Sequence, residues 1–124
     1  DNWVQMYVGR QPEQCGVCGH CMHQFVVEGN GNVYPCDFYC LDEWLLGNIN
    51  SDELEAMANS KKAADFIRES LPVDPKCKAC RYYPFCRGGG CKRSRADRDY
   101  CEAYKKFFSS CLPLFRVFVD EANR

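Results

Sequence analysis

The spacing of the cysteines constrains this chain more than any other feature. Eleven of its 124 residues are cysteine, and most fall into two groups. The first group is CGVCGHC at residues 15–21, and the second is Cys77-x2-Cys80-x5-Cys86-x4-Cys91, followed by Cys101. Two cysteines separated by two residues can present both sulfurs to one metal ion or cluster. Two such groups in one small chain therefore predict a metal protein.

Disulfide bonds are the alternative use of so many cysteines. An odd number argues against a framework made only of disulfides, and the first residues, DNWVQMYVGR, are too polar for a secretion signal. We therefore expect a reducing, cytoplasmic compartment, where closely spaced cysteines are more often ligands than bridges. The chain starts with aspartate instead of methionine, so we expect it to be a piece of a longer protein.

Basic residues and glycines surround the second cysteine group. Residues 76–98 contain eight basic residues and one acidic residue, a net charge of +7, whereas the whole chain carries −1. Four thiolates around zinc or an oxidised [4Fe–4S] cluster leave a net charge of about −2, which basic residues would offset. In RGGGC at 87–91, glycines let backbone N–H groups approach bound sulfurs. Spacing and charge leave both zinc and iron–sulfur clusters open.

Two kinds of partner are not expected. A basic segment can bind nucleic acid, but here it coincides with the cysteines, so we predict no nucleic-acid partner. No apolar run approaches the ~20 residues of a membrane-spanning helix, and we predict no membrane contact.

Turn signals and apolar periodicity predict a small α+β fold stabilised by a metal or cluster. Two β-prone runs, 24–28 and 32–34, flank Gly29-Asn30-Gly31 and predict a short hairpin, because Gly and Asn tolerate positive φ. Helices are expected next, then cysteine-rich loops over residues 76–101, and finally a C-terminal helix.

Capping residues set the expected helix bounds. Ser51 is predicted to cap one helix, and Ser60 to cap a second helix that ends before Pro72. The C-terminal helix is expected from Asp99 onward, with an interruption at Pro113.

The cysteine pattern resembles the SPASM domain, the C-terminal auxiliary-cluster domain of many peptide-modifying radical S-adenosylmethionine enzymes. The family pattern runs Cys-x(9–15)-Gly-x4-Cys, a gap, Cys-x2-Cys-x5-Cys-x3-Cys, a gap, and Cys. This chain departs from it at CRGGGC, which has four residues between cysteines instead of three. The matching positions are Cys21, Gly31, Cys36, Cys77, Cys80 and Cys86, followed by Cys91 and Cys101.

Longer motifs resemble the anaerobic sulfatase-maturating enzymes within that family. They are CGVCGHC, QFVVEGNGNVYPCDFY, LGNI, CRGGGCKR and YCEAYKKFF, and they run from Cys15 to Phe108. The resemblance implies an enzyme that oxidises a Cys or Ser of a sulfatase polypeptide to Cα-formylglycine. In that reaction a 5′-deoxyadenosyl radical removes a β-hydrogen, and the substrate radical then loses an electron and a proton.

The resemblance also implies two [4Fe–4S] clusters. By position, the first ligand set would be Cys15, Cys21, Cys36 and Cys91. The second ligand set would be Cys77, Cys80, Cys86 and Cys101. Three cysteines remain as small buried residues or free thiols: Cys18, Cys40 and Cys111.

One catalytic residue is implied as well, Asp37, which follows Cys36 in YPCDFY. Its carboxylate would take the proton that the substrate radical loses. A carboxylate beside an anionic cluster binds a proton more tightly, which makes it a better base. A capping or hydrogen-bonding role is the structural alternative.

The domain organisation expected from the resemblance has three parts. Residues 1–14 would be a linker from a preceding radical S-adenosylmethionine barrel, 15–111 a SPASM domain with two cluster sites, and 112–124 a helical tail. The Cys-x3-Cys-x2-Cys motif that binds S-adenosylmethionine in these enzymes does not occur in the sequence. We therefore expect S-adenosylmethionine to bind only in the barrel, and the isolated chain to be inactive.

Two other functions stay open. One is the SPASM domain of a different peptide-modifying enzyme, such as one that forms thioethers, from which Asp37 and its CDFY context would distinguish this chain. The other is a non-enzymatic zinc module that binds protein or nucleic acid, and zinc could also occupy a purified fragment. Colour separates these metals, because an iron–sulfur protein is brown and a zinc protein is colourless.

Overall fold

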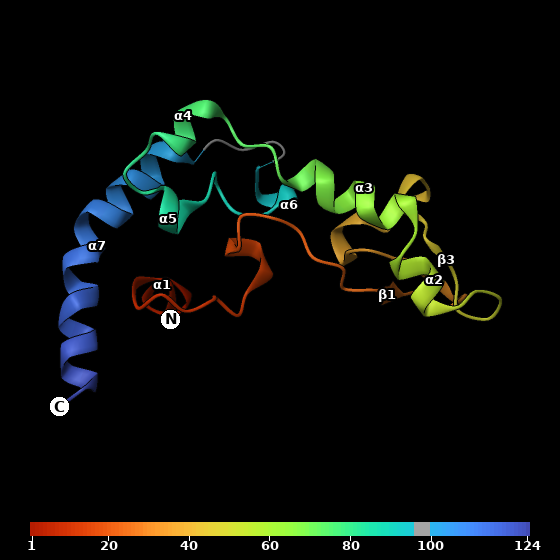
Figure 1. The fold of residues 1–124 in the computed structure, drawn as a ribbon, viewed down its shortest axis with the longest axis horizontal. Coiled ribbons are helices and arrows are strands. Elements are labelled where there is room, and N and C mark those ends of the chain that lie inside the picture. Colours follow the sequence, from red (N-terminus) through yellow and green to blue (C-terminus); the bar gives the residue numbers. More distant parts are fainter. Residues whose placement is uncertain (96–99) are drawn as a thin grey trace. The chain divides into compact units, whose positions relative to one another are not determined.

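The structure, a computed structural model, describes residues 1–95 and 100–124 (Figure 1). These residues form two compact units. Unit 1 comprises residues 1–20 and 73–124, and unit 2 comprises residues 21–72. Each unit is described separately below. Among the described residues, no helix combines the length and the apolar character needed to cross a bilayer.

Unit 2 is built on a three-stranded antiparallel sheet in the order β1-β2-β3. The strands are β1 (Val26–Val27), β2 (Asn32–Tyr34) and β3 (Gly47–Asn48), with Val26 opposite Tyr34 and Val33 opposite Gly47. The predicted hairpin is therefore confirmed, although its first strand is shorter than expected. The third strand was not predicted, because two residues carry too little periodicity to be recognised.

The hairpin turn requires a glycine at position 31. Gly31 has φ of +91°, its N–H donates to the Glu28 carbonyl oxygen at 2.8 Å, and the residue is buried. A Cβ atom there would lie 2.6 Å from Asn50 Nδ2 and 2.7 Å from Asn48 Oδ1. Both the backbone conformation and the neighbouring side chains therefore exclude other residues without rearrangement.

Two helices follow the sheet, α2 (Leu54–Ala58) and α3 (Lys61–Ser70). The predicted cap at Ser60 is confirmed, because its hydroxyl accepts from the Ala63 N–H at 3.2 Å. The predicted cap at Ser51 is wrong, since α2 begins three residues later. The physical reason is a local turn: the Asp52 carboxylate accepts from the Asn48 N–H at 2.8 Å and holds this segment against β3.

Phe66 of α3 lies at the centre of the unit 2 core and is fully buried, as is Val33 of β2. The rings of Tyr39 and Trp44 contact Phe66 edge-on, with centroids 5.3 and 5.1 Å away. Both aromatic residues come from short 3₁₀ helices, η2 (Asp37–Tyr39) and η3 (Asp42–Trp44). The core therefore anchors the segment that follows Cys36.

Unit 1 contains one long helix and several short ones. They are α1 (Asn2–Tyr7), η1 (Cys15–Val17), α4 (Pro75–Lys78), α5 (Tyr83–Cys86), α6 (Lys92–Arg95) and α7 (Cys101–Ala122). The segment predicted as cysteine-rich loop thus contains three one-turn helices. The predicted helix start at Asp99 lies outside the described residues, and α7 begins at Cys101.

Phe108 of α7 is fully buried and organises an aromatic core in unit 1. The rings of Trp3, Phe107 and Tyr82 contact it, with centroids 5.2, 5.2 and 5.9 Å away. Trp3 belongs to α1, so the segment expected to be a linker contains a helix packed on α7. Aromatic pairs of this kind contribute about 0.5–1.5 kcal/mol each beyond the area that they bury.

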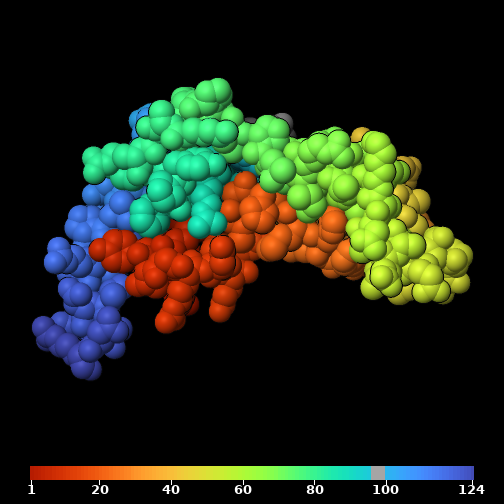
Figure 2. All heavy atoms as spheres, in the orientation of Figure 1, coloured from red at the N-terminus to blue at the C-terminus, as the bar shows by residue number. Residues whose placement is uncertain are grey.

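The predicted interruption at Pro113 is wrong, because α7 continues through it. Proline removes one hydrogen bond, to the carbonyl of Ser109, and both residues are exposed so that water can solvate this oxygen. Figure 2 shows the last turns of α7 (blue) projecting beyond α1 (red). The small α+β fold with a hairpin, short helices, cysteine-rich segments and a C-terminal helix is otherwise confirmed.

Candidate metal centre

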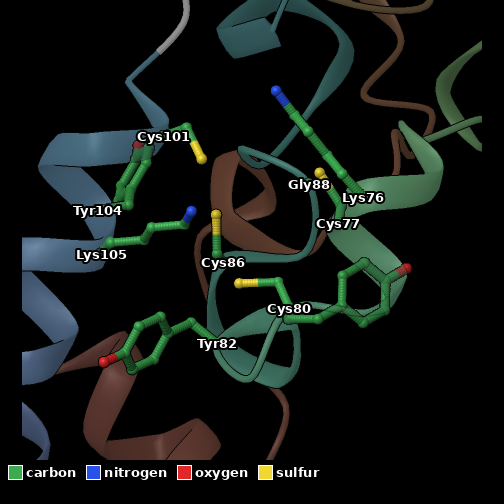
Figure 3. A pocket seen from close by; sticks show the side chains of 10 residues that line it. Lys76, Cys77, Cys80, Tyr82, Cys86, Gly88, Cys101, Tyr104 and Lys105 are labelled. Carbon is green, nitrogen blue, oxygen red and sulfur yellow. The ribbon is translucent and has the colours of Figure 1, made fainter.

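Four cysteines of unit 1 surround one cavity of about 90 Å³. In Figure 3 their sulfur atoms face a common space between α4, α5 and the first turn of α7. They are the members of the second predicted ligand set: Cys77, Cys80, Cys86 and Cys101. The remaining lining residues are Lys76, Tyr82, Tyr83, Gly88, Tyr104 and Lys105.

Consecutive turns bring Cys77 and Cys80 to the same side of the chain. The Asp74 side chain caps α4 by accepting from the Lys76 N–H at 3.0 Å, and Pro75 fits the first helical position. The Cys80 N–H donates to the Cys77 carbonyl oxygen at 3.0 Å and closes the turn between them. The Cys-x2-Cys spacing therefore becomes one tight turn carrying two thiols.

The glycine run after Cys86 lets the chain reverse close to other backbone. Gly90 has φ of +93° and is buried, and a Cβ atom on it would lie 2.3 Å from the Gly16 carbonyl oxygen. The next residue, Cys91, donates its N–H to the same oxygen at 3.0 Å. Earlier in the run, desolvation raises the pKa of Cys86, and a backbone hydrogen bond from Gly89 partly offsets this rise. The expectation that glycines bring N–H groups to bound cysteine sulfur stays a prediction; the Gly89 N–H also donates to the Cys86 carbonyl oxygen at 3.1 Å.

The surroundings of two cavity cysteines, Cys77 and Cys86, disfavour the thiolate form when no cation is present. Desolvation is the largest cause that raises the pKa of Cys77, and repulsion from the charge of Asp74 is the second. Desolvation also raises the pKa of Cys86, and the thiolates of Cys77, Cys101 and Cys80 add to this effect. A bound cation would reverse the balance, since metal binding replaces the protons and removes the repulsion between thiolates.

The sequence analysis did not identify Tyr104 and Lys105 as part of this site. They lie on α7, three and four residues after Cys101, so their side chains share a helix face with that cysteine. The spacing Cys-x2-Tyr-Lys in an expected helix was the signal that could have found them. Lys105 lies outside the basic segment 76–98, so the charge of that segment did not point to it.

Two arginines near the site make structural contacts. Arg87 donates to the carbonyl oxygens of Cys18 at 3.1 Å and Pro84 at 3.2 Å. The guanidinium of Arg81 lies over the Tyr82 ring, 5.2 Å from its centroid. The basic segment therefore does more than offset thiolate charge, because Arg87 also fixes the loop that carries Cys86.

The cavity suits a group larger than one metal ion. Sulfurs bound to zinc lie about 3.8 Å apart, because Zn–S bonds are about 2.3 Å long. Among the described residues, no three Cys, His, Asp or Glu side chains converge on a position for a single ion. The volume of about 90 Å³ also exceeds by several-fold the ~10–15 Å³ that one water molecule needs. The donor set and the volume therefore fit a polynuclear cluster.

The first predicted ligand set is divided between the two units, and it stays a prediction. Cys15 and Cys91 belong to unit 1, where the Cys91 N–H bonds the carbonyl of Gly16 at 3.0 Å. Cys21 and Cys36 belong to unit 2, where desolvation is the largest cause that raises the pKa of Cys36 and the charge of Cys21 is a minor one. Each unit thus brings two members of the set near each other.

Cys91 differs from the other thiols of unit 1. Burial would raise its pKa, but hydrogen bonds from the Ser94 side chain and from backbone N–H groups of α6 outweigh burial and lower it. Ser94 Oγ lies 3.5 Å from Cys91 Sγ. Cys91 therefore ionises more readily than an ordinary cysteine.

The predicted base, Asp37, is the first residue of η2 and is exposed. The Cys36 thiol donates to Asp37 Oδ1 over 3.6 Å. The carboxylate therefore lies beside a predicted ligand and remains open to solvent. Its role as a base stays a prediction.

The three cysteines outside both sets have local backbone contacts or partial burial. Cys18 is 7% exposed and its thiol lies 3.5 Å from the Gln14 carbonyl oxygen, while the Cys40 thiol lies 3.7 Å from the Cys36 carbonyl oxygen. Cys111 is half-buried on α7. None of the eleven cysteines, all of which are described, forms a disulfide.

The chain is similar to curated proteins that are named anaerobic sulfatase-maturating enzymes. The chain is 43% identical over 120 residues to the cysteine-type enzyme of Clostridium perfringens (strain 13 / Type A), covering 91% of this chain and 32% of the relative. It is 33% identical over 125 residues to the serine-type enzyme of Bacteroides thetaiotaomicron, covering 91% of this chain and 30% of the relative. The chain thus spans about a third of the length of these curated relatives.

Solved structures agree in fold. The chain matches native anSMEcpe with bound AdoMet and Cp18Cys peptide at a TM-score of 0.89 and 35% identity, covering 98% of this chain and 36% of that one. It matches native anSMEcpe with bound AdoMet alone at a TM-score of 0.89 and 35% identity, covering 98% and 35%. Residues 15–81, more than half of the chain, match the SPASM iron–sulfur cluster-binding domain. Together with the four thiols around one cavity, this match shows that the chain belongs to the SPASM family of iron–sulfur cluster-binding domains.

Proposed function

We propose that this chain is the auxiliary-cluster domain of a radical S-adenosylmethionine enzyme that oxidises a Cys or Ser of a sulfatase to Cα-formylglycine. The observation that carries the proposal is the cavity lined by Cys77, Cys80, Cys86 and Cys101. The names of relatives that are 43% and 33% identical to this chain suggest the reaction. Both cysteine-type and serine-type enzymes are among them, so the proposal includes both substrates.

Two [4Fe–4S] clusters are part of the proposal. One would be bound by the four cavity cysteines, and the other by Cys15, Cys21, Cys36 and Cys91. A bound cluster supplies a one-electron acceptor. The chain's own residues would hold that acceptor: the short turns of α4, α5 and the segment between them carry three of the thiols, and α7 carries the fourth.

Asp37 is proposed as the group that takes the proton of the substrate radical. Its exposed carboxylate can reach a bound polypeptide, and η2 holds it directly after Cys36. The ring of Tyr39, from the same 3₁₀ helix, packs on Phe66 at 5.3 Å and fixes this segment. A base held in this way contributes about 10²–10⁴-fold to a proton transfer.

The proposed partners are a sulfatase polypeptide and a preceding radical S-adenosylmethionine barrel. Support comes from the solved relative, which is described with bound AdoMet and Cp18Cys peptide. A reducing cytoplasmic compartment is proposed as well, because closely spaced cysteines stay available as metal ligands there. The isolated chain is proposed to make no formylglycine, because the radical would arise in the barrel.

A chimera tests the proposal directly. This chain would replace the matching third of the Clostridium perfringens enzyme, and the Cp18Cys peptide would be assayed for formylglycine by mass spectrometry. We expect product from the chimera and none from its Cys80→Ser variant. A chimera with full iron content that cleaves S-adenosylmethionine but makes no formylglycine would contradict the proposed reaction.

The role of Asp37 can be tested in the same chimera. Asp37→Asn keeps the size of the side chain but removes the proton acceptor, so formylglycine should fall by about 10²–10⁴-fold. Cleavage of S-adenosylmethionine should continue, because hydrogen abstraction comes earlier, and iron content should not change. Asp42→Asn is the matched control, since Asp42 is an exposed acid at the start of the neighbouring η3. Full product from Asp37→Asn would make Asp37 a structural residue.

A further inference from the structure

We propose that the ammonium group of Lys105 raises the reduction potential of the cluster bound by Cys77, Cys80, Cys86 and Cys101. It would do so by stabilising the reduced and more negative form of the cluster. The inference rests on the proposed function, because it takes these four thiolates to be cluster ligands. Lys105 binds no metal in this proposal and acts through its charge.

Helix geometry directs Lys105 toward the thiols. It lies one turn after Cys101 on α7 and lines the same cavity. Figure 3 shows its ammonium group turned toward the sulfurs of Cys101 and Cys86. The position follows from the helix, because side chains four residues apart lie on one face.

The electrostatics of Lys105 agree with this placement. The charge of the Cys101 thiolate is the largest cause that raises the pKa of Lys105, and Glu102 is the second. Lys105 Nζ lies 3.7 Å from Glu102 Oε1, but the Glu102 side chain is 92% exposed. Solvent therefore weakens this ion pair, and the pair does not remove the ammonium charge from the cavity.

Other described cations near the cavity are less suited to this role. Lys76 also lines the cavity, and its charge partly offsets the rise in the pKa of Cys77 that desolvation causes. Figure 3, however, shows its ammonium group pointing away from the sulfurs. Arg87 donates to two carbonyl oxygens instead. Lys105 is therefore expected to have the larger effect, with Lys76 a weaker contributor.

The physical effect follows from the charges of the two redox states. An oxidised cluster with four thiolates carries about −2, and one added electron brings it to about −3. No bond forms or breaks, and the electron donor is oxidised as the cluster iron is reduced. A nearby positive charge stabilises the −3 state more than the −2 state, so it raises the potential. In the proposed reaction, this makes the cluster a better acceptor for the electron of the substrate radical.

The test is a potentiometric titration of Lys105→Met. The chain would be reconstituted anaerobically in a Cys15→Ser background, where only the second ligand set is complete. Dithionite would supply electrons, one per cluster, and electron paramagnetic resonance would follow the reduced state. We expect the equilibrium for reduction to weaken about tenfold, which is a shift of about 59 mV to lower potential for one electron.

Matched variants separate charge from structure. Lys105→Arg keeps the positive charge and should keep the potential. Lys106→Met removes an exposed charge from the same helix, outside the cavity lining, and should not shift it. Lys76→Met should give a smaller shift than Lys105→Met. High salt should reduce the Lys105 effect, because the side chain is 47% exposed.

The outcomes distinguish the inference from the proposed function. If Lys105→Met holds the same iron and has the parent potential, the inference is wrong and the proposed function stands. If Lys105→Met loses its iron, Lys105 supports assembly instead and the inference is also wrong. If the parent chain binds no cluster at the four cysteines, both proposals fall.

Discussion

Individual thiols in this chain differ in acidity because their surroundings differ. Desolvation raises the pKa of Cys77 and Cys86, whereas hydrogen bonds from Ser94 and the backbone of α6 overcome desolvation and lower that of Cys91. All three are half-buried, so exposure alone does not separate them. The sequence marked these residues only as equivalent candidate ligands.

Alkylation rates should reveal this difference. The thiolate is the nucleophile, so in the metal-free chain at about pH 7.5 iodoacetamide should modify Cys91 faster than Cys77 or Cys86. Raising the pH to about 9.5 should narrow the gap, because a thiol with a raised pKa ionises only there. Mass spectrometry of tryptic peptides measures each rate. The Ser94→Ala variant should slow Cys91, and equal rates for all three cysteines at both pH values would contradict the assignment.

At the scale of elements, short turns and glycines position the ligands more than regular structure does. Asp74 and Pro75 begin the single turn of α4, and Gly90 allows the chain to pass the Gly16 carbonyl. The extra glycine relative to the family pattern is accommodated, since the residues before Cys91 adopt positive φ. The long helix α7 then supplies Cys101 and Lys105 from one face.

Replacing Gly90 with alanine should therefore disrupt the metal centre. The added Cβ would meet a backbone oxygen, and alanine disfavours positive φ, so we expect a loss of more than about 1 kcal/mol in the free energy of unfolding. Urea denaturation of the reconstituted chain measures this, and iron content should fall as well. Gly29→Ala is the control, because a Cβ there meets nothing within 4 Å. Similar stability for both variants would show that the loop can shift without loss.

At the scale of the whole molecule, eleven cysteines serve two small units. A domain of about 60 residues buries only about 60% of the surface of its unfolded chain, so its core gives limited stability. Each unit here is centred on one fully buried phenylalanine, Phe66 or Phe108. Metal–thiolate bonds would add to the stability that such small cores provide.

Iron content tests the assignment of all ligands together. Two complete sets of four cysteines predict about eight irons per chain after anaerobic reconstitution. Cys36→Ser or Cys80→Ser should lose about half, as measured by iron and sulfide analysis. Replacing Cys18, Cys40 or Cys111 should leave the content unchanged. Half the iron in a Cys18→Ser chain would overturn the division into ligands and non-ligands.

The sequence by itself indicated the kind of group that the chain binds, and it determined several local elements. Cysteine spacing indicated a metal or cluster protein, and its resemblance to the SPASM domain is confirmed by the family match. The hairpin around Gly31 and the cap at Ser60 were predictable, because turns and caps depend on a few neighbouring residues. The start of α2 and the unbroken course of α7 were not predictable. The hydrogen bond from the Asn48 N–H to the Asp52 carboxylate decided the first, and solvation at the exposed Pro113 decided the second.

Only the tertiary structure decided which side chains share the cavity. Cys77 and Cys101 are far apart in sequence, and the fold of unit 1 brings them to one space. Lys105 and Tyr104 line the same space because they lie on the face of α7 that is turned toward the cavity. The orientation of this face depends on how Phe108 packs among Trp3, Tyr82 and Phe107. Local spacing fixes which residues can face the same way, but burial of the aromatic core fixes the direction.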